Sequence, residues 1–326
     1  MNLLEAIDAR HAIRAYADEP VAPDVLAQLQ AEIDACNAES GLHIQMAAGL
    51  DDAFLGLKTH YGRFKGVHNA IALIGAVAGG SDGDGEVATA VSAETDSRVN
   101  RDAASAVPAA PATPAIATTL QSFKDAEGTP VSAQAADLQE RVGYYGERLV
   151  LRAVQLGLET SWAVLDGAEN VDPADAWWTL GDGESVVWVI AFGHGARPGG
   201  RRRTKPIEEL ASVVVDSVTE RTDVVQSVGK ADQHADGSGD AALANHSFAN
   251  APDWFLAGME VAMKAPTSLS QQPFHFTLHL GDGRDGGSDD GEVTAEALDG
   301  LFAHVGLGCA KYHFEIGAAP HKVEWR

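Results

Sequence analysis

The chain has 326 residues, of which 45% are hydrophobic, so it is long enough for one large domain or two small ones with a sizeable core. Its formal net charge is −24, from 47 acidic and 23 basic residues. A chain this acidic is repelled by phosphate backbones and by anionic lipid, which argues against nucleic-acid and membrane partners.

Targeting and redox signals point to the cytoplasm. No apolar run reaches the roughly 18 residues that span a bilayer, and the N-terminus lacks the basic region and long apolar stretch of a signal peptide. The two cysteines, Cys36 and Cys309, are not part of a CxxC pair. We therefore expect no disulfide framework, no bound metal and a reducing compartment.

The first part of the chain alternates helical and strand patterns. Residues 3–15 are expected to form a helix, and Pro23-Asp24 begins a second one with apolar residues at helical spacing up to Cys36. The apolar run 70–77 predicts a strand. Between about 79 and 134 the composition shifts to Ala, Gly, Ser, Asp, Thr and Pro without any period, which indicates a flexible insertion.

Order returns after that insertion. A helix is expected from about Ala136 to Leu156, with Gly157 as its cap. The run Ser185 to Phe192 is rich in β-branched and aromatic residues and predicts a strand. A basic run, residues 201–205, follows a glycine-rich loop.

The C-terminal part repeats this order of elements. A helix is expected at 253–264, a strand at 274–280, an Asp/Gly loop at 281–292 and a helix at about 294–316. Pro-Asp opens a helix at residues 23 and 252, and paired glycines accompany each long helix, Gly146 with Gly157 and Gly306 with Gly317. We infer a degenerate duplication: residues 1–215 form one unit, 216–247 a linker, and 248–326 a second, partial repeat.

Several segments resemble the FMN-dependent nitroreductase family. Residues 10–14 (RHAIR) look like its basic motif Arg-[Arg/His]-Ser-x-[Arg/Lys] at the end of its first helix, and 156–162 (LGLETSW) resemble its Leu-Gly-Leu-Gly-Thr-x-Trp. Residues 265–274 (APTSLSQQPF) are similar to its Ala-Pro-Ser-Ser-x-Asn-x-Gln-Pro-Trp turn, and 203–210 (RTKPIEEL) to its basic C-terminal segment. The resemblance covers most of the chain outside the insertions. It implies an α+β fold with a central, mostly antiparallel sheet flanked by helices.

The family usually works as a homodimer with FMN at the interface, each site taking its basic residues from one subunit and the turn from the other. Here the basic pieces lie in the first unit and the turn lies in the second, which resembles a fused pseudo-dimer. Counting back from Pro252 places Gly239 and Leu243 where Arg10 and Arg14 would fall. We therefore expect one FMN per chain, in a monomeric pseudo-dimer or a weak homo-oligomer.

The resemblance also implies the residues that hold FMN. Basic groups would bind the phosphate, hydroxyls and an amide of the turn would reach the ribityl chain, and backbone N–H groups would face the flavin N5. Arg10 and Arg14 are expected on one face of a helix. Ala12 replaces the family's Ser and removes a hydroxyl donor, and Ser270 replaces the family's Asn with a shorter group, whose contact is either lost or bridged by water. The expected set is Arg10, His11, Ala12, Arg14, Leu165, Asp166, Gly167, Arg203, Lys205, Pro266, Thr267, Ser268, Ser270 and Gln272.

The implied activity is NAD(P)H-dependent, ping-pong reduction of nitroaromatic or quinone-like acceptors through FMN, with no general acid or base assigned. Two alternatives stay open. One is a specialised flavin enzyme of the same fold, such as a dehalogenase, a dehydrogenase or a flavin-consuming enzyme. The other is a flavin-binding or scaffold protein without turnover.

Overall fold

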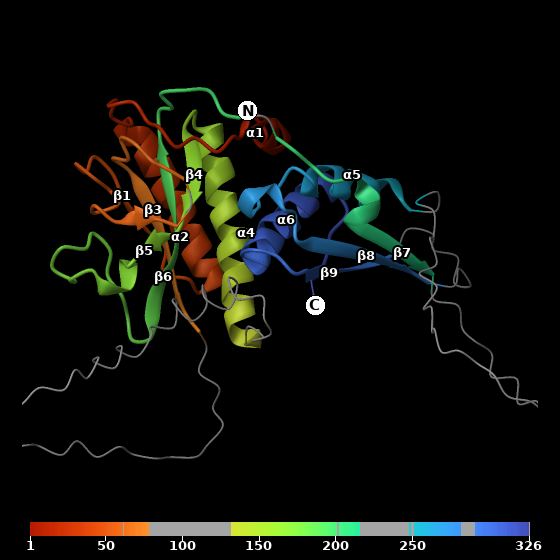
Figure 1. Ribbon diagram of the computed structural model, residues 1–326. Coiled ribbons are helices and arrows are strands. Elements are labelled where there is room, and N and C mark those ends of the chain that lie inside the picture. The colour runs from red at the N-terminus through yellow and green to blue at the C-terminus, as the bar shows by residue number, and fades with distance from the viewer. Residues whose placement is uncertain are drawn as a thin grey trace, which may run out of the picture.

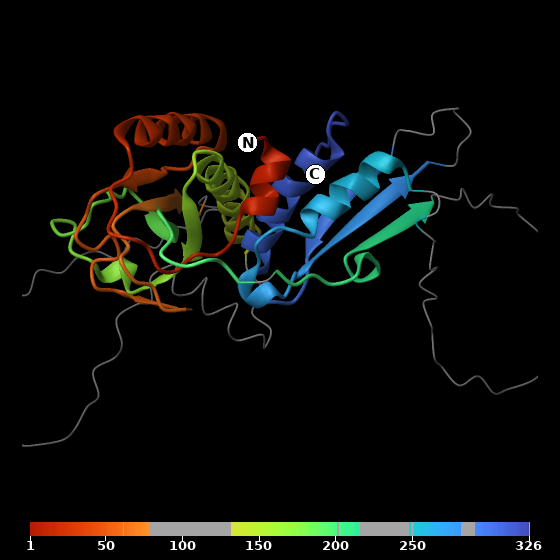
Figure 2. The same cartoon turned by 90° about the horizontal axis from the view of Figure 1, so that it is seen from above.

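The computed structural model describes residues 1–60, 62–77, 132–200, 202–215, 248, 251–281 and 291–325. Within them, two long helices lie side by side in the middle, α4 (Ala133–Gln155) and α6 (Ala303–Ala318), with a sheet on either side (Figures 1 and 2). Residues 79–131 of the expected insertion, the expected linker 216–247 and residues 282–290 of the expected Asp/Gly loop lie outside the described residues.

The first sheet has the strand order β1 (Gln45–Ala47), β3 (Ala70–Ala76), β6 (Glu184–Gly193) and β4 (Glu159–Ala163), with antiparallel neighbours throughout. Both faces of β3 are buried. Ile71 and Leu73 pack against α2 (Pro23–Ser40) and α4, while Ala72 and Ile74 belong to a second cluster on the opposite face. A strand buried on both faces reads as a continuous apolar run, which is why 70–77 was recognisable in the sequence.

A two-stranded sheet, β2 (Lys58–Thr59) with β5 (Leu165–Asp166), lies beside the first sheet and is followed by the 3₁₀ turn η1 (Ala168–Asn170). The third sheet has the order β7 (Ala211–Val215), β8 (Phe274–Leu280) and β9 (Glu292–Ala297), with β7 parallel to β8 and β8 antiparallel to β9. Helices α5 (Asp253–Ala262) and α6 cover it. Strand β7, which follows η2 (Ile207–Glu209), therefore joins a sheet formed with the C-terminal part of the chain.

The α+β class with mostly antiparallel sheets flanked by helices is confirmed, as are the expected helices that became α2, α4 and α5 and the strands β3, β6 and β8. Two expected helices were wrong in extent. Helix α1 spans only Leu3–Ala9; beyond it the chain is extended, because Ile13 N–H donates to the Thr160 carbonyl (2.9 Å) and Tyr16 N–H to the Lys65 carbonyl (3.0 Å).

The expected helix at 294–316 is strand β9 followed by α6. Residues 292, 294 and 296 are exposed, whereas Val293 is buried in the core and Ala295 and Ala297 are half-buried against it. That period of two, paired with β8 in a ladder, determines the conformation. The helix begins only after Phe302, which adopts a left-handed conformation (φ 56°).

Helices α4 and α6 cross at glycines with reciprocal contacts. A Cβ on Gly143 of α4 would lie 2.1 Å from the Val305 carbonyl oxygen, and a Cβ on Gly308 of α6 would lie 2.0 Å from the Glu140 carbonyl oxygen. Gly143 thus contacts Val305, three residues before Gly308, and Gly308 contacts Glu140, three residues before Gly143. The two contacts are therefore reciprocal at the point where the helices cross.

Candidate functional site

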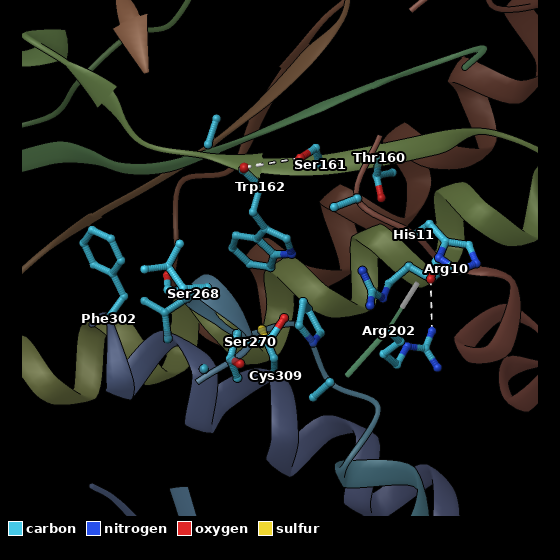
Figure 3. A pocket seen from close by; sticks show the side chains of 18 of the residues that line it. Arg10, His11, Thr160, Ser161, Trp162, Arg202, Ser268, Ser270, Phe302 and Cys309 are labelled. Carbon is cyan, nitrogen blue, oxygen red and sulfur yellow. Dashed lines mark hydrogen bonds between the residues drawn. The ribbon is translucent and has the colours of Figure 1, made fainter. Parts of the chain in front are cut away.

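A cavity of about 590 Å³ lies where the N-terminal part of α6 and the 265–272 turn face strand β4 and the extended segment after α1 (Figure 3). Its lining therefore comes from both sequence blocks. The lining residues are Arg10, His11, Ala12, Arg14, Thr160, Ser161, Trp162, Ala163, Val164, Trp188, Gly200, Arg202, Arg203, Ala265, Pro266, Thr267, Ser268, Leu269, Ser270, Gln272, Phe302, Val305, Gly306 and Cys309.

Guanidinium groups gather at one end of the cavity. Arg202 Nη2 donates to the carbonyls of Ile7 (2.7 Å) and Arg10 (3.0 Å), so it binds the C-terminal carbonyls that α1 leaves unpaired. Arg10 itself is 8% exposed, and its Nε makes no hydrogen bond in the described part of the chain. Burial and the neighbouring Arg10 charge lower the pKa of Arg202. Two such cations held close together in a cavity wall form a receptor for an anion.

A buried carboxylate lies behind this wall. Glu147 of α4 is fully buried, and its Oε1 is 3.6 Å from Arg10 Nε and 2.9 Å from His313 Nε2. Its Oε2 accepts a hydrogen bond from Trp162 Nε1 at 3.2 Å. Glu147 therefore fixes two residues of the cavity wall, Arg10 and Trp162, and connects both to α6.

Aromatic rings form the other end of the cavity. Trp162 and Trp188 are in edge-to-face contact (5.7 Å between centroids), as are Trp188 and Phe302 (4.8 Å). In Figure 3, Trp162 projects from β4 between the Arg10–Arg202 end and the Phe302–Ser268 end. The cavity thus has a cationic end and an aromatic end, separated by an indole whose position is fixed by Glu147.

The turn from the second block closes the cavity opposite β4. Leu269, Ser270 and Gln272, in and after the 3₁₀ turn η4 (Ser268–Ser270), all have positive φ (53°, 56° and 47°). Left-handed conformations of non-glycine residues cost energy and cluster at binding sites. Leu269 is 68% exposed although it is apolar, so the turn presents a hydrophobic side chain at the rim of the cavity.

Most of the residues expected from the sequence line this one cavity: Arg10, His11, Ala12, Arg14, Arg203, Pro266, Thr267, Ser268, Ser270 and Gln272. Leu165, Asp166, Gly167 and Lys205 are not in the lining; the first two form β5, and Asp166 Oδ1 is 3.0 Å from His60 Nδ1. The expectation that Arg10 and Arg14 share a helix face was wrong, because both follow the end of α1. Arg14 instead packs over Phe64 (5.9 Å).

Sequence reasoning missed part of the lining. Arg202 lies inside the basic run 201–205, but nothing in a run of three arginines distinguishes the one that binds α1. Trp188 is hidden in the apolar strand β6, and Phe302 and Cys309 come from a helix whose start was misplaced. The run 160–164 was recognisable only through the tryptophan of the family motif.

In the described part of the chain, no helix combines the length and apolar character needed to cross a membrane. A family model described as "Putative TM nitroreductase" matches residues 2–84, 129–231 and 234–318, which is most of the chain and includes both blocks. No curated protein matches.

Solved structures with similar folds are nitroreductases by name. One is described as a "putative nitroreductase" from Thermotoga maritima (13% identity, 97% of this chain and 83% of that chain, TM-score 0.43). Another is described as a "putative nitroreductase in complex with fmn" from Desulfovibrio desulfuricans (19% identity, 64% of this chain and 94% of that chain, TM-score 0.35). A third is the NfrA1 nitroreductase from B. subtilis (10% identity, 64% and 72%, TM-score 0.36).

The family model spans both blocks of the chain, which is compatible with a fused duplication. The chain therefore belongs to the nitroreductase family that this model describes.

Proposed function

We propose that this chain binds one FMN in the cavity between its two blocks and uses it to reduce nitroaromatic or quinone-like acceptors with NAD(P)H. The observation that carries the proposal is the polarity of the cavity: the buried Arg10 and the half-buried Arg202 at one end, and edge-to-face aromatic rings at the other. An anionic tail and a flat apolar ring in one ligand match that arrangement.

The residues present fit FMN. Its phosphate carries about two negative charges and would bind at the cationic end. There the Nε of Arg10 makes no hydrogen bond in the described part of the chain, and its counter-charge Glu147 lies behind the wall at 3.6 Å. A volume of about 590 Å³ is within the range of about 300–1,000 Å³ that is usual for cofactor sites. Arg10, Arg202 and Arg203 would hold the phosphate, while the hydroxyls of Thr267 and Ser268 line the path toward the ring end.

FMN supplies the redox chemistry when bound, because it takes a hydride from NAD(P)H and passes two electrons to the acceptor. The chain's own contribution is to orient the ring and to exclude water from it. Trp162 stands against the middle of the cavity, and Trp188 and Phe302 wall the ring end with apolar surface. The exposed Leu269 at the rim adds apolar surface where a flat acceptor would approach.

We also propose that residues 1–215 and 248–326 are the two units of a fused pseudo-dimer that works as a monomer or a weak homo-oligomer. The reciprocal contacts of Gly143 and Gly308 support this arrangement, as does the cavity lined from both units. The extended Arg10–Arg14 segment is paired with β4, so the first unit supplies this part of the phosphate end.

The visible absorption spectrum of the purified full chain tests the proposal. We expect oxidised-flavin bands at about one flavin per chain, bleached by NADH or NADPH without oxygen and restored by a nitroaromatic or quinone. Flavin that binds but is not bleached would instead favour the non-catalytic alternative. Flavin that is bleached, but not reoxidised by these acceptors, would favour a specialised enzyme. A chain that binds no FMN contradicts the proposal.

A further inference from the structure

Gln272 makes an unusually complete set of hydrogen bonds for a residue beside a ligand cavity. It is only 2% exposed. Its Oε1 accepts from the Lys205 backbone N–H at 2.6 Å, and its Nε2 donates to the Met263 carbonyl at 2.9 Å and to Thr204 Oγ1 at 3.2 Å. Both donors of the amide and its carbonyl are therefore bonded to protein atoms.

The backbone of Gln272 takes part in the same contact. Its N–H donates to Thr267 Oγ1 at 3.0 Å, and its carbonyl lies 3.5 Å from Lys205 Nζ. The Thr204 hydroxyl in turn donates to the Lys205 carbonyl at 3.1 Å. The turn of the second block and residues 204–205 of the first are thus joined by one hydrogen-bond network. The network is centred on the buried amide of Gln272, and a satisfied network of this kind holds its members in one arrangement.

This network fixes one end of the basic segment 202–205. The other end is fixed by Arg202, whose Nη2 binds the Ile7 and Arg10 carbonyls at the end of α1. Arg203 lies between the two attachments, lines the cavity and has no hydrogen-bond or ion-pair partner among the described residues. Its backbone position therefore depends on both attachments.

We propose that Gln272 is a positioning residue: it does not bind the flavin but clasps residues 204–205, so that Arg202 and Arg203 are held at the phosphate end of the cavity. The inference rests on the proposed function, because it takes FMN as the ligand of the cavity. The clasp joins the basic segment of the first unit to the turn of the second. The preference for a phosphorylated flavin would therefore depend on this contact between the two units.

The test compares FMN with riboflavin, which lacks the phosphate, on flavin-free full-length protein. Gln272→Met keeps the length of the side chain and removes all three amide bonds. We expect the ratio of FMN to riboflavin affinity to fall about 10-fold, equal to about 1.4 kcal/mol, while riboflavin affinity changes little. Thr204→Val should lower the ratio less, and should add little to Gln272→Met because both break one network.

Gln271→Met is the matched control, because Gln271 is the adjacent, exposed residue and lies outside the cavity lining. Among the described residues, its side-chain amide bonds only to Leu301 N–H, from which its Oε1 accepts at 3.1 Å. It should leave the ratio unchanged. An equal loss of FMN and riboflavin affinity in Gln272→Met would overturn the inference, since it would place Gln272 against the part that the two ligands share.

Hydrogen exchange separates this inference from the proposed function. Without any flavin, the Lys205 amide should exchange faster in Gln272→Met than in the wild type, because its acceptor is gone. If the wild type binds neither flavin but Lys205 exchange still rises, the FMN proposal fails and the clasp stands. Unchanged exchange at Lys205 would refute the clasp itself.

Discussion

Glu147 offers the sharpest test of how the cavity wall is held together. Its carboxylate is fully buried and has three partners: Arg10 Nε at 3.6 Å, His313 Nε2 at 2.9 Å and Trp162 Nε1 at 3.2 Å. Glu147→Leu keeps similar bulk and removes the negative charge. Arg10, itself 8% exposed, would then remain in the wall without a counter-charge.

The expected cost follows from that geometry. Opposite unit charges 3.6 Å apart attract by about 5 kcal/mol at an effective dielectric constant of about 20. The loss of one partner of a buried pair typically costs about 3–5 kcal/mol, because the other charge stays buried. We therefore expect Glu147→Leu to lower the free energy of unfolding by about 3–5 kcal/mol, measured by urea denaturation with fluorescence and circular dichroism.

Glu39→Leu is the control. Glu39 pairs with Arg148 Nη1 at 2.6 Å, but its side chain is 51% exposed, so the loss should stay within about 1 kcal/mol. In addition, Arg10→Met in the Glu147→Leu background should restore part of the stability by removing the stranded charge. The reasoning is refuted if Glu147→Leu costs no more than Glu39→Leu, or if the double variant is no more stable than Glu147→Leu.

Three further predictions concern the helix crossing, the thiols and a histidine. Gly308→Ala should destabilise the protein by about 1–3 kcal/mol or more, because its Cβ would meet backbone of α4, whereas Gly281→Ala, with nothing within 4 Å, should be nearly neutral in the same denaturation assay. Burial raises the pKa of Cys36 to about 12 and that of Cys309 well above its ordinary value. Both thiols should therefore react with iodoacetamide at pH 8 far more slowly in the native chain than in the unfolded chain. A thiol that reacts fast in the native chain would contradict this prediction. Burial, opposed by the charge of Glu140, lowers the pKa of His304 below 6.5. Between pH 6.5 and that lower pKa the unfolded chain binds more protons than the folded chain, so the stability falls as the pH falls. His304→Gln should reduce the loss of unfolding free energy between pH 7.5 and 5.5, measured in the same denaturation assay. An unchanged slope of unfolding free energy against pH would contradict this prediction.

Short-range patterns account for what the sequence by itself determined. Apolar period and cap chemistry are local, so α2, α4 and the strands β3, β6 and β8 were predictable to within a few residues. Most of the residues expected from the motifs around Arg10 and Pro266 also line the cavity, because a motif fixes residue type at positions that need a given chemistry. The duplication and its division between two blocks stay a proposal, which the repeated order of elements suggests.

Tertiary contacts decided the rest. Residues 10–16 look helical in isolation but are extended, because their backbone groups bond to Thr160 and Lys65, far away in the chain. Strand β9 resembled a helix until its pairing with β8 fixed a period of two. Gln272 and Glu147 acquire their roles only when α4, α6 and the basic segment meet. A buried polar group must find its partner wherever the fold brings one, and that choice cannot be read from its neighbours in sequence.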